Sequence, residues 1–361
     1  MIYFYPHPYL RDRQLDTIRH WPGNEVLNPE IAQNRKGAQV SKGRAISTKN
    51  KRSWKQIFPL INIKLRPNAA PKDAVVYLWG GLIATGQFIV DIDNPWSLVG
   101  YNIGAMPLYR WIIERILLSQ RCLEIRCMSV ACRQSLFELF GESVYRKATV
   151  HYPTAGIVLV SGIKASTKSP CRFLFIGSQF EIKGGAAMLA AFKAAQKSNP
   201  EITLEVITHL PASFVDEASQ ISGLTVHAPE FSRFEIFEHM KNADVLLHPS
   251  YMESFGMTIL EAMAHGLAIV ANDIYAIREM VVNGENGFLL RAPISKWEGA
   301  LPNQNFMKKN EYLNAIRELD NEEYVGDLTR VIVELASNAE LANKMKINSL
   351  RRFQEMNSNN G

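Results

Sequence analysis

The chain of 361 residues is 47% hydrophobic and 21% charged, with a formal net charge of +5. This composition is typical of a folded globular protein, and the length favours two domains over one. No apolar run is long enough to span a bilayer, and the N-terminus lacks the basic-then-apolar order of a secretory signal. No CxxC pair is present, which argues against a zinc site or a disulfide framework and favours a reducing cytoplasm. The four cysteines are Cys122, Cys127, Cys132 and Cys171.

The first distinctive segment, at about residues 35–55, is basic and polar, with the sequence RKGAQVSKGRAISTKNKRSWK. It has no apolar periodicity, which predicts a long surface loop. Its charge has two interpretations: a solvated surface, or attraction to an anionic membrane or a lipid-phosphate acceptor. The apolar residues between Trp54 and Ile61 favour docking at an interface. No stacking motif or recognition fold accompanies the charge, so nucleic-acid binding is not expected.

Strand and helix patterns then alternate, which predicts a parallel sheet covered on both faces. The expected strands are 74–79, 87–92, 124–129 and 149–152, and the expected helices are 108–119 and 133–140. Ligands of such sheets bind at the carboxyl ends of the strands. The residues expected there are Gly80, Gly81, Asp91, Asp93 and Ser129. We take Gly80 and Gly81 as candidates for the acceptor side of a site.

The polar stretch at 163–171, IKASTKSPC, predicts a hinge between two domains. We expect a first domain at 1–165, a second at 172–335, and a C-terminal helix at 336–361 that is a candidate for packing back on the first domain. Hinged domains commonly close around substrates. The second domain repeats the alternation, with expected strands at 172–176, 202–207, 224–227, 244–247, 268–271 and 287–290.

The loop FIGSQFEIKGG, residues 175–185, follows the first of these strands. The strand ends at Gly177, and Lys183 precedes Gly184 at the start of a helix. A lysine beside a helix N-terminus combines a point charge with backbone donors, which suits a diphosphate. The alternative is a surface lysine at a turn. The spacing matches neither a P-loop nor a dinucleotide fingerprint.

A second strand-to-helix corner carries two carboxylates. Glu253 lies in the turn ahead of the helix, and Glu261 lies about two helical turns in. Gly256 lets a ligand approach the backbone, and the helix dipole favours an anion such as a phosphate. Carboxylates beside an anion would repel it, so we expect them to accept hydrogen bonds from neutral hydroxyls. A nucleotide sugar offers both hydroxyls and phosphates.

The run ESFGMTILEAMAHG, with its flanking strand and the later NGENGF, resembles the donor-site signature of the family-4 retaining glycosyltransferases. The resemblance covers residues 173–290 well and the N-terminal half faintly. It implies the GT-B fold, in which two Rossmann-like doubly wound parallel-sheet domains face each other across a cleft. It also implies transfer of a sugar from a nucleotide diphosphate donor to an acceptor hydroxyl, with retention of the anomeric configuration.

The resemblance assigns roles to individual residues. Glu253 would orient the donor sugar, Glu261 would take the ribose hydroxyls, and Lys183 would stabilise the leaving diphosphate. Ser178 stands where the family usually has an arginine for that diphosphate. The nucleotide base would lie near His227 and Pro229. The full set of expected donor contacts is Gly177, Ser178, Lys183, Gly184, Glu253, Ser254, Phe255, Gly256, Met257, Thr258 and Glu261.

The Asp91-x-Asp93 pattern is the metal-binding mark of GT-A glycosyltransferases, a different fold, and a strand-end turn explains it adequately here. We therefore expect neither a metal nor another cofactor. The expected partners are a nucleotide diphosphate sugar and a glycan or lipid-linked acceptor of the cell envelope, at a cytoplasmic or peripheral membrane location. The alternatives are a GT-B-fold epimerase or phosphorylase, and a non-catalytic nucleotide-sugar binder, which Ser178 keeps open.

Overall fold

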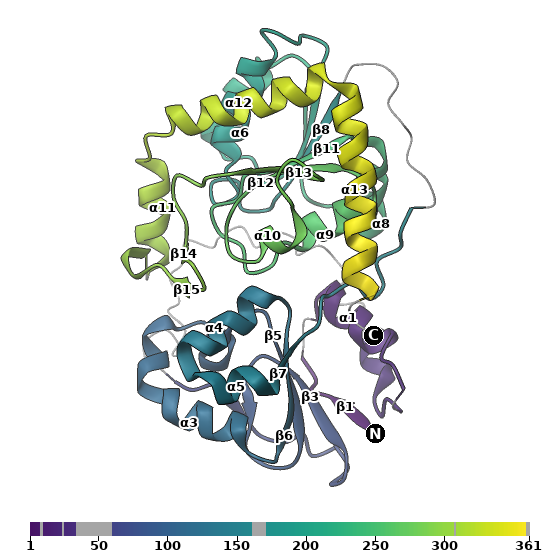
Figure 1. Cartoon of the computed structure of the whole chain (residues 1–361), viewed down its shortest axis with the longest axis vertical. Helices are drawn as coiled ribbons and strands as arrows, with labels where there is room; N and C mark the ends of the chain where they lie inside the picture. Colours follow the sequence, from purple (N-terminus) through teal and green to yellow (C-terminus); the bar gives the residue numbers. More distant parts are fainter. Residues whose placement is uncertain (8–9, 24, 34–59, 161–170, 307, 359–361) are drawn as a thin grey trace. The chain divides into compact units, whose positions relative to one another are not determined.

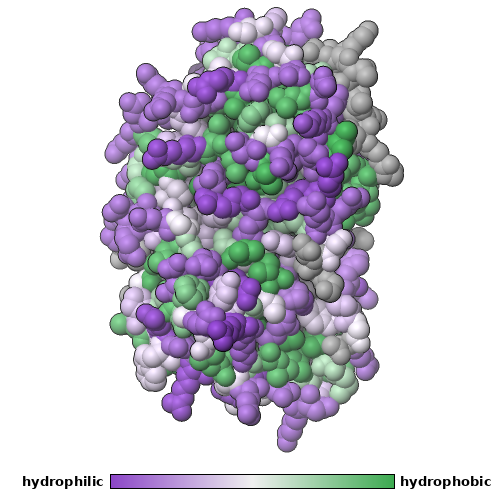
Figure 2. Space-filling view, viewed as in Figure 1, coloured by the Kyte–Doolittle hydropathy of each residue, from purple (hydrophilic) through white to green (hydrophobic). Residues whose placement is uncertain are grey.

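The computed structural model describes residues 1–7, 10–23, 25–33, 60–160, 171–306 and 308–358. The chain divides into two compact units (Figure 1). Unit 1 contains Met1–Gly156 and Gly299–Pro302, and unit 2 contains Ile157–Glu298 and Asn303–Ser358. The predicted basic loop and nearly all of the predicted hinge lie outside the described residues. Hydrophilic residues cover most of the face drawn in Figure 2, and hydrophobic residues reach it in patches.

Unit 1 is built on a five-stranded sheet of order β1-β3-β5-β6-β7, and all of its pairings are parallel. Its strands are β1 (Ile2–Phe4), β3 (Val75–Trp79), β5 (Phe88–Ile92), β6 (Cys122–Cys127) and β7 (Ala148–Val150). Every residue of β5 is buried, as expected for a central strand of a parallel sheet. Strand β1 was not expected from the sequence. A short pair, β2 (Ile63–Lys64) and β4 (Leu82–Ile83), lies apart from the main sheet.

The helices of unit 1 include two, α3 and α4, that the sequence predicted and two, α1 and α5, that it did not. They are α1 (Asp12–Arg19), α3 (Met106–Leu118), α4 (Val130–Phe140) and α5 (Glu142–Lys147), with short 3-10 helices η1 (Pro29–Gln33), η3 (Pro95–Val99) and η4 (Ile103–Ala105). Ser129 begins α4, because its side chain accepts a hydrogen bond from the backbone N–H of Cys132. The side chain of this polar residue at the strand end therefore serves as the N-cap of α4.

Unit 2 is built on a six-stranded parallel sheet of order β10-β9-β8-β11-β12-β13. Its strands are β8 (Arg172–Ile176), β9 (Thr203–Ile207), β10 (Leu224–His227), β11 (Val245–His248), β12 (Ala268–Asn272) and β13 (Gly287–Leu290). After β8, strands β9 and β10 extend the sheet on one side, and strands β11, β12 and β13 then extend it on the other side. The chain direction across the sheet thus reverses between β8 and β11, which is the switch point where ligands of doubly wound sheets bind.

The helices of unit 2 are α6 (Gly185–Ala195), α7 (Val215–Ser219), α8 (Arg233–Asn242), α9 (Met257–Ala264), α10 (Ile277–Met280), α11 (Lys309–Arg317), α12 (Glu322–Ser337) and α13 (Ala339–Ser358). Residues of α6, α12 and α13 contribute to an apolar core that includes Phe173, Phe192, Val245 and Ile332. The remaining elements are η5 (Ala212–Phe214), η6 (Gln304–Phe306), β14 (Trp297–Glu298) and β15 (Leu301–Pro302). The last helix, α13, packs on α9 and β12 within unit 2.

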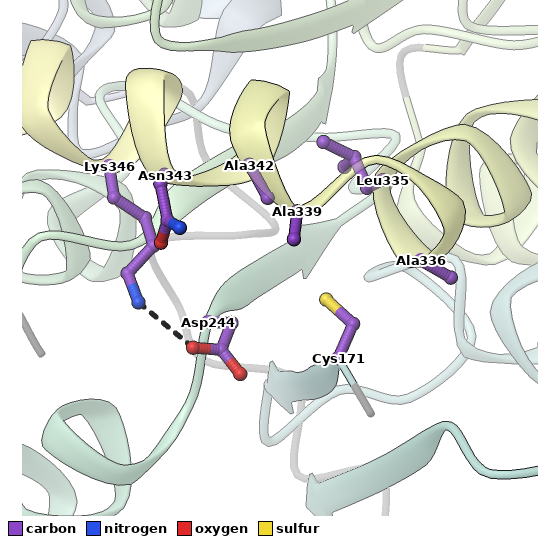
Figure 3. A pocket seen from close by; sticks show the side chains of 8 residues that line it. All are labelled: Cys171, Asp244, Leu335, Ala336, Ala339, Ala342, Asn343 and Lys346. Atoms are coloured by element: carbon purple, nitrogen blue, oxygen red, sulfur yellow. Dashed lines mark hydrogen bonds and ion pairs between the residues drawn. The ribbon is translucent and has the colours of Figure 1, made fainter. Parts of the chain in front are cut away.

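A buried ion pair attaches α13 to the amino-terminal edge of this sheet. Lys346 Nζ lies 2.9 Å from Asp244 Oδ1, and their side chains are only 5% and 2% exposed. Asp244 also accepts a hydrogen bond from Arg172 Nε at 3.1 Å. Burial alone would raise the pKa of Asp244, but the bonds from Arg172 and Lys346 lower it. Figure 3 shows both side chains beside a small cavity that Cys171 and Ala342 also line.

We predict that Asp244→Ala lowers the free energy of unfolding by about 3–5 kcal/mol, because it leaves the Lys346 ammonium buried without a counter-ion. Urea unfolding monitored by circular dichroism measures this loss. The matched control is Asp327→Ala, whose partner Arg330 is 73% exposed. Its expected effect is within about 0.5 kcal/mol. Equal losses in the two variants would contradict the assignment.

Candidate functional site

Two loops meet at the carboxyl ends of the adjacent parallel strands β8 and β11. The first runs from Gly177 to the start of α6, and the second runs from His248 to the start of α9. Both leave the sheet at the switch point described above, where open ends of the sheet leave room for a ligand. The structure therefore brings together the two corners that the sequence marked separately.

The two loops are in direct backbone contact. The N–H of Tyr251 donates to the carbonyl of Ile182 at 2.9 Å. Gly184 has φ +74°, and a Cβ there would lie 2.1 Å from the carbonyl oxygen of Pro249. Only glycine fits this position, because any side chain would collide with backbone rather than with a flexible group. At Gly177 the neighbour is a side chain instead, since a Cβ there would lie 2.8 Å from Lys183 Cγ.

At this junction Lys183 Nζ donates to Glu253 Oε1, and the two side chains are 22% and 13% exposed. His248 Nε2 lies 2.7 Å from the same carboxylate oxygen. Burial lowers the pKa of His248, so its ring is neutral near pH 7 and donates its Nε2–H. Burial opposes ionisation of Glu253, but the charge of Lys183 and the bond from His248 lower its pKa to about 2. Glu253 is thus ionised and held by two donors.

The second loop ends at the N-terminus of α9. Gly256 caps the helix with φ +103°, and a Cβ there would lie 3.1 Å from Met280 Cε. Phe255 is buried, whereas Ser254, Met257 and Thr258 are half-buried. The first backbone N–H groups of a helix have no partner within the helix, and its dipole attracts anions. This end of α9 can therefore supply donors to a phosphate.

Glu261 lies in the second half of α9 and is paired with a residue that the sequence did not mark. Arg233 Nε donates to Glu261 Oε1 at 3.1 Å, and the side chains are 21% and 16% exposed. Arg233 is placed at the start of α8 by a capping box between Ser232 and Glu235. This pair cannot be predicted from a local sequence motif, because its members are 28 positions apart in the chain.

The predicted base-binding residues occupy the carboxyl end of β10. His227 Nε2 lies 2.9 Å from Glu205 Oε1, and His239 Nδ1 lies 2.9 Å from the same oxygen. The ring of Phe231 packs edge-on against His227. Pro229 is buried. Contacts around His227 thus connect β9, β10 and α8. Ser178, which stands where the family usually has an arginine, follows β8 and is exposed.

The predicted acceptor-side glycines lie in unit 1, buried at the turn after β3. Gly80 and Gly81 have φ of +66° and +78° and pack against Ser97 and Asn62. These positions require glycine for the turn itself. The nearby Asp91 accepts from Arg13 at 3.0 Å and from the hydroxyl of Tyr77 at 2.7 Å.

Asp93 accepts from the hydroxyl of Tyr101 at 2.9 Å. The two carboxylates of the Asp-x-Asp pattern therefore have separate partners. Among the residues that the structure describes, no group of three His, Cys, Asp or Glu side chains has the arrangement of a metal site. In the same part of the chain, no helix is both long and apolar enough to cross a bilayer.

The low pKa of Glu253 can be tested directly. We predict that Glu253 titrates near pH 2 instead of near its usual 4.5, and that Lys183→Met raises the midpoint because it removes the main positive charge. Carboxyl ¹³C NMR, assigned with Glu253→Gln, measures both. Because the folded-state pKa is depressed, the pair stabilises the fold above about pH 4.5 and loses this effect as the pH falls towards 2. An unchanged midpoint in Lys183→Met would exclude the ion pair.

Comparison with known proteins shows what this part of the chain is similar to. Residues 162–318 match the family Glycosyl transferases group 1. A D-inositol 3-phosphate glycosyltransferase of Paenarthrobacter aurescens is 29% identical over 138 residues, which are 36% of this chain and 34% of that protein. A phosphatidyl-myo-inositol mannosyltransferase of Mycobacterium tuberculosis is 32% identical over 126 residues, 32% of each chain. The chain thus spans about a third of the length of these relatives.

Solved structures extend the likeness beyond the matched domain. The pneumococcal O-GlcNAc transferase GtfA, in complex with UDP and GlcNAc, superposes with a TM-score of 0.53 at 15% identity, covering 79% of this chain and 54% of that one. WaaG, a glycosyltransferase involved in lipopolysaccharide biosynthesis, superposes with a TM-score of 0.51 at 16% identity, and the match covers 79% of this chain and 74% of WaaG. At such identity these likenesses concern the fold. The chain therefore has the GT-B fold, and its residues 162–318 are similar to the family Glycosyl transferases group 1.

Proposed function

We propose that this protein is a retaining glycosyltransferase that moves a hexose from a nucleotide diphosphate sugar to an acceptor hydroxyl in the synthesis of a cell-envelope polysaccharide or glycolipid. The observation that carries the proposal is the cluster of Lys183, Glu253 and His248 at the switch point of unit 2, inside the matched domain. The names of the relatives, which act on inositol phosphates and phosphatidyl-inositol, support a glycolipid acceptor.

The donor would bind with its diphosphate between Lys183 and the N-terminus of α9. Lys183 supplies a positive charge from one loop, and the first amides of α9 supply donors from the other. As the bond from the anomeric carbon to the diphosphate breaks, negative charge collects on the leaving oxygen. Donors already fixed in place stabilise this charge without reorganisation. Gly177 and Gly184 leave the space in which the Lys183 loop reaches this position.

Glu253 would bind the donor sugar without leaving its own partners. Both of its described contacts, from Lys183 and His248, are to Oε1. Within the part of the chain that the structure describes, Oε2 has no hydrogen-bond partner. This oxygen can accept from a sugar hydroxyl, while Oε1 stays fixed. His248 would act as a positioning residue, since it holds the carboxylate from the buried side.

Glu261 would bind the ribose hydroxyls of the nucleotide, with Arg233 keeping its carboxylate oriented. In this account the acceptor oxygen forms the new bond to the anomeric carbon, and its proton leaves with the nucleotide diphosphate. The protein supplies neither a nucleophile nor a metal, so we expect transfer in the presence of EDTA. A lipid-linked acceptor would place the reaction at the cytoplasmic face of a membrane.

Transfer and donor binding can be tested in sequence. A thermal-shift panel of UDP-, GDP- and ADP-sugars identifies the donor, because a ligand of the folded state raises the unfolding temperature. With that donor, Glu253→Gln should lower kcat by about 100-fold or more, while Glu261→Gln should mainly raise KM. The control is Glu238→Gln on the exposed side of α8. Unchanged transfer in Glu253→Gln would refute the site.

A second candidate, a non-catalytic nucleotide-sugar binder, is favoured by two observations. Ser178 replaces the expected arginine, and Glu253 already neutralises part of the charge of Lys183. We predict that Ser178→Arg raises kcat/KM about tenfold, because a charged hydrogen bond to the diphosphate is added. Steady-state kinetics with the identified donor measures this. A wild-type protein that binds a donor but neither transfers nor hydrolyses it would support the binder instead.

A further inference from the structure

Helix α3 of unit 1 exposes apolar side chains on the face opposite to the one that it buries. Met106, Ile113 and Leu117 point into unit 1 and are fully buried. On the other side Leu108, Trp111 and Leu118 are 58%, 65% and 41% exposed. We call Leu108, Trp111, Arg115 and Leu118 the α3 stripe. Their spacing of three, four and three residues aligns them along one side of the helix. A helix that is apolar on both sides normally has both sides covered.

The surroundings of the α3 stripe are positively charged. Arg110 and Arg115 are exposed, and neither forms an ion pair with another residue that the structure describes. Glu114 is the one acidic residue of α3. Lys147 adds a further positive charge, because its Nζ donates to the carbonyls of Leu117 and Ser119 at the C-terminal end of the helix. Exposed Trp and Leu with flanking Arg is the pattern of a helix that lies in a membrane interface.

The positive charge also favours a membrane over a second copy of the chain as the partner of the α3 stripe. In a symmetric dimer through the stripe, the Arg115 side chains of both copies would lie in one small interface and repel each other. A stable protein interface also buries about 800 Å² on each side, more than three apolar side chains supply. A bilayer needs neither symmetry nor a complementary surface. Anionic headgroups attract the guanidinium groups, while the apolar side chains enter the acyl boundary.

We propose that α3 is a membrane-docking helix that binds the surface of an anionic bilayer. Leu108, Trp111 and Leu118 would enter the boundary between headgroups and acyl chains, and Arg110 and Arg115 would contact lipid phosphates. This surface is separate from the residues assigned to transfer, and the binding does not require a donor. It also differs from the basic segment at 35–55, which stays unchanged in every variant described below.

The test is co-sedimentation of the full chain with vesicles of phosphatidylcholine alone and of equimolar phosphatidylcholine and phosphatidylglycerol. Wild type should bind the anionic vesicles, less so at high salt. Arg110→Gln with Arg115→Gln should lower the partition coefficient about 25-fold, or about fivefold for each charge. Leu108→Ser with Trp111→Ser should lower it at least about tenfold, because both side chains lose their burial in the bilayer.

Two variants serve as controls. Ile347→Ser on α13 removes an apolar side chain that is 51% exposed in a helix that also carries Lys344 and Arg351, and it should bind like wild type. Trp111→Phe should retain binding but lose the blue shift of tryptophan fluorescence that vesicles produce in wild type. Thermal unfolding should be unchanged in all variants, since the substituted side chains are exposed.

Three results would overturn the proposal. The first is a wild-type chain that does not bind anionic vesicles at low salt. The second is equal binding by wild type and both double variants, which would assign the binding to another surface. The third is a wild-type dimer in the absence of lipid that Leu108→Ser with Trp111→Ser converts to a monomer, which would make the stripe an interface between copies. Because no donor is present, each outcome is independent of whether the chain transfers sugar.

Discussion

The parallel pairing of β8 with β11 is the constraint on which the candidate site depends. It places the ends of two strands side by side, although Lys183 and Glu253 are 70 residues apart in the chain. The ion pair between them then settles the chemistry of the junction. A buried carboxylate would otherwise take up a proton. Glu253 keeps its negative charge because Lys183 and His248 are beside it, so the junction holds a cation and an anion next to each other.

Such a paired arrangement suits a ligand that is itself divided into a charged and a neutral part. In the proposed mode of binding, a diphosphate would contact the ammonium group and the helix amides, and sugar hydroxyls would donate to a carboxylate that stays ionised. A site with lysine alone would bind any phosphate, and a site with glutamate alone would repel every one. The neighbouring His248 is neutral and buried, so it adds a hydrogen bond without changing this balance.

The sequence predicted the six strands of the main sheet of unit 2 closely, because strands such as β11 and β12 are short, mostly apolar runs bounded by polar or turn residues. Lys183 and Glu253 were predicted as parts of one site, and they are in contact. Arg233 and His248 were not, because their roles depend on partners that only the folded chain brings near. Strand β1 was missed for a different reason: three residues next to a proline carry too little periodicity. The basic loop and the donor roles of individual residues remain predictions.

Strand β11 is only four residues long, and the chain uses both of its ends. Asp244, just before it, is clamped to Lys346 near the middle of the final helix, and His248, its last residue, holds the carboxylate proposed to grip the sugar. Deleting α13 would therefore remove the ion pair with Asp244 and destabilise the strand that carries the candidate site. The last helix, although distant in sequence, therefore helps to hold the strand that carries the candidate site.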